Sequence, residues 1–239
     1  MTVFFAFVFL LFSSPVLAAT IITFDAESST SDGSTSNVNF NHTIGGGCAN
    51  PIVVVSFVWY PSSETPTVTI GGGAATTVNS IVGSRAIFMA RRTGLSGVVA
   101  VNIAMSGTID QLLASARSYC NVHQSSPTGT SVTAGGGDVS GAPNTVDVSS
   151  ATDELVIDAI YVKDDTGQSL TADAGQTERF NQTTSFYFMG GESDKAGAAG
   201  TTTMSWTQTA DLAWGLIGVS LKPAAAAATG ARRRLVVVQ

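Results

Sequence analysis

The chain carries IVVVSFVW at residues 52–59, an almost unbroken apolar run without a charged residue. A short run rich in β-branched and aromatic residues is typical of a strand that is covered on both faces. The stretches ELVIDAIYV at 154–162 and LAWGLIGVSL at 212–221 have the same character. We therefore expect several buried strands to form the core.

Glycine-rich and threonine-rich turns separate these runs from shorter segments of alternating polarity. In residues 37–44, for example, every second position is apolar or His42, and the positions between them are Asn or Thr. This period of two residues is typical of a half-buried strand. Turn signals recur at roughly the 8–12 residue spacing of sandwiches and barrels. No tandem repeat and no long helical period is visible. The sequence predicts an all-β fold, a jelly-roll-like sandwich of two antiparallel sheets, as a single domain over residues 20–223.

The N-terminus has the pattern of a secretion signal. Residues 3–11 are apolar and aromatic, Ser13-Ser14-Pro15 breaks the run, and small residues follow up to Ala19. The run is short for a membrane span, which disfavours the alternative of a membrane anchor. We expect residues 1–19 to be a cleaved signal peptide and the mature protein to be secreted and associated with the cell surface, without a membrane segment.

The charge of the chain argues against nucleic acid as a partner. The sequence has 11 basic and 17 acidic residues, a net charge of −6. Three of the basic residues are Arg232, Arg233 and Arg234, so the rest of the chain has a net charge of 8 − 17 = −9. An acidic body repels a phosphate backbone.

Cys48 and Cys120 are the only cysteines. In an exported protein two cysteines can pair because the compartment is oxidising, and we predict a disulfide, with two free buried thiols as the alternative. Two cysteines and two histidines at wide spacing do not form a zinc pattern.

The composition changes after Pro223, and residues 224–239 form an alanine linker and a basic, apolar tail. Its last strand-forming residues are Leu235, Val236, Val237 and Val238. An uncharged segment of high β-propensity is a template for pairing with a sheet edge. We predict assembly into a homo-oligomer or a filament through this strand, with folding back onto its own domain as the alternative. The three arginines are then flanking gatekeepers, and the other interpretations of them are a solvated tail or a contact for anionic surface polymers.

Several segments in order resemble a group of β-sandwich modules of secreted bacterial, archaeal and phage-associated surface proteins. These segments are NHTIGGGCANPIVVVSFVW (41–59), PTVTIGGG (66–73), SSPTGT (125–130), DELVIDAIYV (153–162) and TMSWTQTADLAWGLIGVSLKP (203–223). The resemblance implies a jelly-roll-like sandwich in an extracellular setting. Because its motifs are core strands and turns, it transfers no catalytic residue.

No motif predicts an enzyme. Asp153 and Glu154 are neighbours and would point to opposite faces of a strand, so they cannot flank one sugar. Asp158 interrupts an apolar run and needs a partner if it is buried, which makes it the one carboxylate to consider for catalysis. His42 and His123 lie far apart, and no Gly-x-Ser-x-Gly motif is present. We therefore predict a non-catalytic structural or adhesive subunit that needs no cofactor.

The alternative prediction is a carbohydrate-binding module, with calcium as an optional ion and a glycan as partner. Its candidate ligand-binding residues are Tyr60, at the end of the 52–59 run, and Tyr187, within an alternating aromatic segment. Asp164 and Asp165, in an acidic turn, are the candidate calcium ligands, although Asp and Gly also form turns without an ion. A glycoside-active enzyme that uses Asp158 is the third hypothesis.

Overall fold

The computed structural model describes residues 20–83, 85–136, 143–163, 169–184, 188–209 and 212–225. Every regular element in these residues is a β-strand, and neighbouring strands pair antiparallel. No helix in the described part of the chain could cross a membrane. The predicted all-β antiparallel fold is confirmed.

The strands fall into an N-terminal half, β1 to β9, and a C-terminal half, β10 to β17. The N-terminal strands are β1 (Thr23–Asp32), β2 (Thr35–Thr43), β3 (Ile52–Tyr60), β4 (Pro66–Ile70), β5 (Gly73–Ala74), β6 (Thr76–Val82), β7 (Ala86–Thr93), β8 (Val98–Ile109) and β9 (Gln111–Cys120). The C-terminal strands are β10 (Val132–Gly136), β11 (Asn144–Ser150), β12 (Leu155–Lys163), β13 (Leu170–Ala172), β14 (Thr177–Thr183), β15 (Phe188–Ala196), β16 (Gly200–Gln208) and β17 (Trp214–Leu221).

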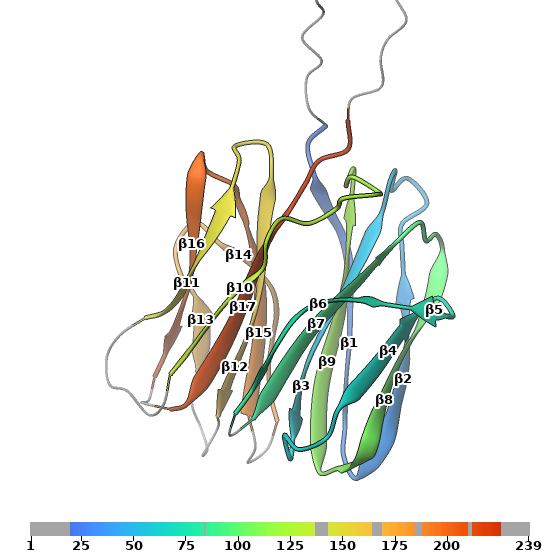
Figure 1. Cartoon of the computed structure of the whole chain (residues 1–239), viewed down its shortest axis with the longest axis vertical. Coiled ribbons are helices and arrows are strands. Elements are labelled where there is room, and N and C mark those ends of the chain that lie inside the picture. The colour runs from blue at the N-terminus through green and yellow to red at the C-terminus, as the bar shows by residue number, and fades with distance from the viewer. Residues whose placement is uncertain are drawn as a thin grey trace, which may run out of the picture.

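Each half contains one outer and one inner sheet. The N-outer sheet is β2-β8-β4-β5 and the N-inner sheet is β1-β9-β3-β7-β6. The C-inner sheet is β10-β17-β12-β15-β14 and the C-outer sheet is β11-β16-β13. In Figure 1 the four sheets are seen edge on, stacked in the order N-outer, N-inner, C-inner, C-outer.

The two halves have the same strand order. In each, the first strand pairs with the last (β1 with β9, β10 with β17), and the chain crosses repeatedly between its two sheets, with one hairpin inside each inner sheet (β6–β7 and β14–β15), which is a jelly-roll-like arrangement. β3 and β12 hold the same central position in the two inner sheets. The described chain is therefore two matching sandwiches packed through their inner sheets.

Three apolar layers fill the spaces between the four sheets. Val55 and Phe57 of β3 pack toward the N-outer sheet, whereas Val54 and Val58 pack toward the C-inner sheet. The third layer, around Trp206, lies between the C-inner and C-outer sheets. The unbroken apolar character of β3 follows from this cover on both faces, and it explains why there are four sheets where two were expected.

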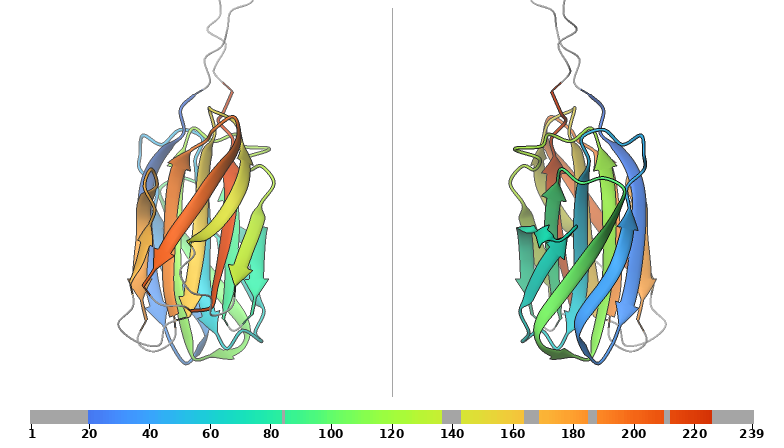
Figure 2. Two further views of the ribbon diagram at one scale, coloured as in Figure 1. Left: turned by 90° about the vertical axis from the view of Figure 1, so that its left-hand side faces the viewer. Right: turned by 90° about the vertical axis from the view of Figure 1, so that its right-hand side faces the viewer.

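Both ends of the described chain lie at one pole of the molecule, as Figures 1 and 2 show. The Thr20 hydroxyl donates a hydrogen bond to the Ala224 carbonyl at 2.6 Å. The Ala224 N–H in turn donates to the carbonyl of Asn121 at 2.7 Å. Residues 1–19 and 226–239 lie outside the described residues, so the predicted signal peptide and tail strand stay predictions.

Candidate functional site

The two inner sheets meet across buried charged and hydroxyl side chains, which we call the junction cluster. Its members are Ser115, Arg117 and Tyr119 of β9, Glu192 and Asp194 of β15, and Arg179 of β14. Alternate residues of a strand face the same side, so β9 can direct three of them at the C-inner sheet. The intervening Ala114 and Ala116 pack on the opposite side.

Arg117 is fully buried and bonds to both halves of the protein. Its Nε lies 2.6 Å from Oε2 of Glu192, and its Nη2 donates to the carbonyl of Asp158 at 3.0 Å. The Ser115 hydroxyl donates to the same Glu192 oxygen at 2.7 Å. Burial lowers the pKa of Arg117, but the Glu192 carboxylate together with Tyr119, Asp158 and Asp194 outweighs it, and the pKa is raised overall. Arg117 therefore stays charged, paired across the junction.

A second ion pair continues the junction cluster toward solvent. Arg179 donates to Asp194 in a bidentate manner, from Nε at 2.6 Å and from Nη2 at 3.1 Å. The Tyr119 hydroxyl donates to the same carboxylate at 3.4 Å, and the Arg179 guanidinium lies 4.1 Å from the centre of the Phe24 ring. Since the Arg179 side chain is 25% exposed, this pair contributes less than the buried one.

Asp158 lies on the opposite face of the C-inner sheet and is fully buried. Its Oδ1 accepts from the Ser193 N–H and hydroxyl at 2.7 and 2.8 Å, and its Oδ2 accepts from Nε1 of Trp206 at 2.7 Å. Burial raises the pKa of Asp158 to about 7, although the Trp206 and Ser193 hydrogen bonds oppose the rise. A Cβ on Gly191 would lie 2.7 Å from the Trp206 ring, so glycine is needed there for the ring to reach Asp158.

These buried groups hold sheets together and have no room for a substrate. The space beside Glu192, lined also by Ser56 and Phe180, has a volume of about 10 Å³, which is one water molecule at most. Both oxygens of Asp158 are occupied by protein donors. The arrangement favours a structural role for Asp158.

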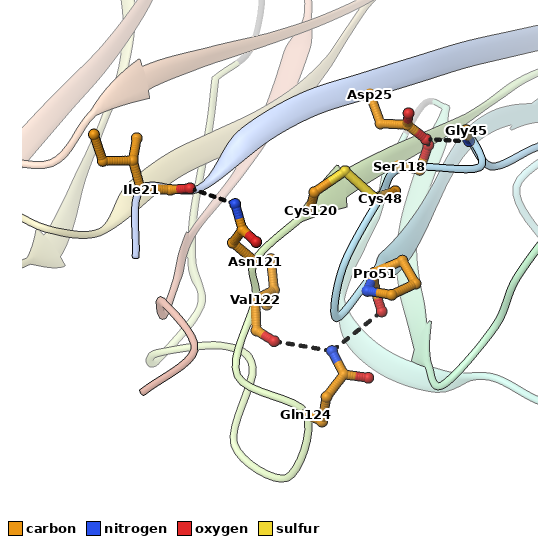
Figure 3. The surroundings of a disulfide bond; sticks show 10 residues. All are labelled: Ile21, Asp25, Gly45, Cys48, Pro51, Ser118, Cys120, Asn121, Val122 and Gln124. Atoms are coloured by element: carbon orange, nitrogen blue, oxygen red, sulfur yellow. Dashed lines mark hydrogen bonds between the residues drawn. A yellow bond between two sulfur atoms is a disulfide. The ribbon is translucent and has the colours of Figure 1, made fainter. Parts of the chain in front are cut away.

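The predicted disulfide between Cys48 and Cys120 is present, with a Cα–Cα distance of 5.0 Å (Figure 3). It fastens the turn between β2 and β3 to the last residue of β9. Beside it, Asp25 accepts hydrogen bonds from the Ser118 hydroxyl at 2.7 Å and the Gly45 N–H at 2.9 Å (Figure 3). Asp25, Cys48 and Cys120 are the only such group within ion-binding distance in the described part of the chain, but the disulfide removes both thiolates as ligands.

His42 of β2 is fully buried. Its Nδ1 lies 3.0 Å from the Ser28 hydroxyl. Burial lowers the pKa of His42, with the Asp25 charge acting in the opposite direction. The histidine is therefore a neutral core residue at physiological pH.

Of the predicted ligand-binding residues, the structure describes Tyr60. It is half-buried at the end of β3, and the Arg85 guanidinium lies 4.1 Å from the centre of its ring. A cation over one face leaves that face closed to a sugar. Tyr187, Asp164 and Asp165 lie outside the described residues, as do Leu235 to Val238.

Two surface hollows were not predicted from the sequence, because each joins segments far apart in the chain. The pole groove, of about 300 Å³, lies next to the chain ends and is lined by residues 20–22, 152–155 and Ala196. The side groove, of about 500 Å³, is an open hollow near the start of β17, lined by Ile81, Gly83, Gly135, Gly136, Tyr161, Ala213 and Trp214.

No protein-family model matches the chain, and the searches of curated proteins and of solved structures found no significant match. The resemblance to secreted β-sandwich surface modules is therefore still a prediction.

Proposed function

We propose that the protein is a non-catalytic extracellular structural or adhesive subunit that is attached and assembled at one pole. The observation that carries the proposal is the hydrogen bond between Thr20 and Ala224, which brings both ends of the described body together. Whatever the ends connect to, the rest of the body projects away from it. The tail, with Arg232–Arg234 and the predicted strand at 235–238, follows in sequence from the described end at this pole.

The interior suits a rigid body that is displayed outside the cell. The Arg117–Glu192 pair joins the inner sheets, and the Cys48–Cys120 bond closes the N-terminal half. Disulfides persist in oxidising compartments, which supports export.

The test compares the full chain with a variant that ends at Ala225, both expressed for export from the full-length gene. The shorter variant keeps every described contact. Light scattering after size-exclusion chromatography and negative-stain electron microscopy report the assembly state. We expect the full chain to associate and the shorter chain to be a monomer. If both are monomers, assembly through the tail is wrong.

A carbohydrate-binding module is the second proposal, and the side groove favours it. Trp214 is half-buried and lies among three glycines there, above the buried Tyr161, a combination of an aromatic group and flat backbone against which a sugar ring can pack. A glycan screen of the Ala225-terminated chain, with calcium and with a chelator, tests this proposal and the predicted role of Asp164 and Asp165. Binding that Trp214→Ala reduces supports it, and an empty screen excludes the sugars tested.

A further inference from the structure

The pole groove combines apolar and acidic surface. Ile21, on its wall, is 80% exposed and is the most exposed large apolar side chain in the described residues. Asp153 at the rim is exposed, and Glu154 next to it is half-buried. The Glu154 carboxylate is held in place because its Oε2 accepts from the Ala151 N–H at 3.1 Å. Such a surface suits a partner that is basic and apolar in sequence.

The tail of this chain has that chemistry in that order. Arg232, Arg233 and Arg234 precede the apolar residues 235–238. The arginines complement Asp153 and Glu154, and the apolar residues can cover Ile21. The acidic body, with a net charge of −9 without these arginines, draws the tail toward it.

The position and length of the tail also fit. Ala224 is bonded to Thr20, which itself lines the pole groove, so the tail leaves the body beside the groove. Residues 226–239 span up to about 45 Å when extended, at roughly 3.3 Å per residue. This length is sufficient to cross from one body to the groove of another.

We propose that the pole groove binds residues 231–239 of a second copy of this chain, with the arginines on Asp153 and Glu154 and the apolar residues on Ile21. The inference rests on the proposed assembly through the tail and identifies its receptor. Because the donated tail and the receiving groove share one pole, the exchange is reciprocal. Reciprocal exchange gives a closed, two-fold pair. A filament does not form, because the pole groove and the tail of both copies are already occupied in the pair. A body stacked on the pole also covers Ile21.

A charge-swap experiment tests this. One variant carries Asp153→Lys, and the other carries Arg232→Glu, Arg233→Glu and Arg234→Glu, each in the full chain. Alone, each variant has repulsive contacts in every groove, and we expect its pairing to be at least about tenfold weaker than that of the wild-type chain. Mixed in equal amounts, the two variants form a mixed pair in which both exchanges are attractive, and we expect pairing to recover.

The matched control is Asp110→Lys, the same charge change on an exposed aspartate of the β8–β9 turn, at the other pole. It should pair like the wild-type chain, and circular dichroism checks that all variants are folded. Mass by light scattering gives the readout.

The outcomes separate the inference from the proposed function. If the full chain pairs through its tail but Asp153→Lys pairs normally, the pole groove is not the receptor for the tail, while the proposed assembly through the tail is kept. If the single variants weaken pairing but the mixture does not recover, exchange between copies is wrong. The wild-type chain could instead be a monomer whose tail is protected from proteolysis only while Asp153 is present. The tail would then occupy the groove of its own chain, and the proposed binding to a second copy would be wrong. Filaments in the microscope would exclude the closed pair.

Discussion

The N-terminal and C-terminal halves share one strand order but fill their interiors by different means. Between the two N-terminal sheets the interior is almost entirely apolar, and the Cys48–Cys120 bond ties β9 to the turn before β3. Between the two C-terminal sheets, Asp158 collects hydrogen bonds from Trp206 and Ser193, and the described part of that half contains no cysteine. The same strand order is therefore compatible with more than one kind of core.

The contact between the halves is of a third kind, since it combines apolar packing with buried charge. Ile157 and Val54 pack in the same layer in which Arg117 meets Glu192. Apolar sheets can slide, whereas a buried ion pair tolerates one register. We infer that the junction cluster fixes how the two sandwiches are aligned.

The largest effect is expected from breaking the junction. Arg117→Met leaves the Glu192 carboxylate buried without a counter-ion, and it should lower the free energy of unfolding by about 3–5 kcal/mol. Urea denaturation followed by tryptophan fluorescence measures this. The double variant Arg117→Met with Glu192→Met removes both charges and should recover much of the loss. A loss under 1 kcal/mol for the single variant would show that the pair is not structural.

Removing the disulfide should have the next largest effect and should act on one half. The Cys48–Cys120 bond spans a sequence separation of 72 residues. Replacing both cysteines by serine should cost about 2–4 kcal/mol, as for other native disulfides. Hydrogen exchange should rise in β1, β3 and β9 and much less in β11 and β16. Equal loss of protection in both halves would contradict the view that the bond serves the N-terminal half.

The buried Asp158 should make stability depend on pH. Its pKa is about 7 in the folded protein and about 4 in an unfolded chain, so the folded state binds more protons between these values. The contribution of Asp158 to stability is therefore present at low pH and is lost as pH rises through this window. The difference in free energy of unfolding between the wild-type chain and Asp158→Asn should fall by on the order of 2 kcal/mol from pH 4.5 to 8. Parallel pH curves would show that Asp158 titrates normally.

The smallest effect is expected at the surface. Arg85→Ala removes the cation over the half-buried Tyr60 ring and should cost about 0.5–1 kcal/mol. The same change uncovers the ring, so a glycan screen of this variant asks whether Tyr60 can bind sugar once its face is open. Arg91→Ala, a change of the same type on β7 and away from Tyr60, is the control. Sugar binding by both variants would exclude Tyr60 as the binding residue.

Much of the fold could be predicted from the sequence. The run at 52–59 indicated a strand covered on both faces, and the pairing of Cys48 with Cys120 was expected from the cysteine count together with the predicted export. The repeated strand order could not be seen, because the matching strands β3 and β12 share burial but not residues: where β3 has only apolar side chains and Ser56, β12 carries Asp158.

The junction cluster and the pole groove could not be predicted either. Arg117 looks like an ordinary polar residue of a half-exposed strand, and its partner Glu192 lies 75 residues further along the chain. Ile21 and Asp153 line one groove at the pole only because β1 and β12 both begin there. Such sites depend on how the two sandwiches are stacked, and local patterns carry no information on that.

The central claim is that the junction cluster joins the two sandwiches into one cooperative folding unit. Calorimetry of the Ala225-terminated chain at pH 7 tests this claim directly. We predict one transition whose calorimetric enthalpy equals its van't Hoff enthalpy. Two transitions in the chain with Arg117 intact would contradict the account, since the halves would then fold and unfold independently.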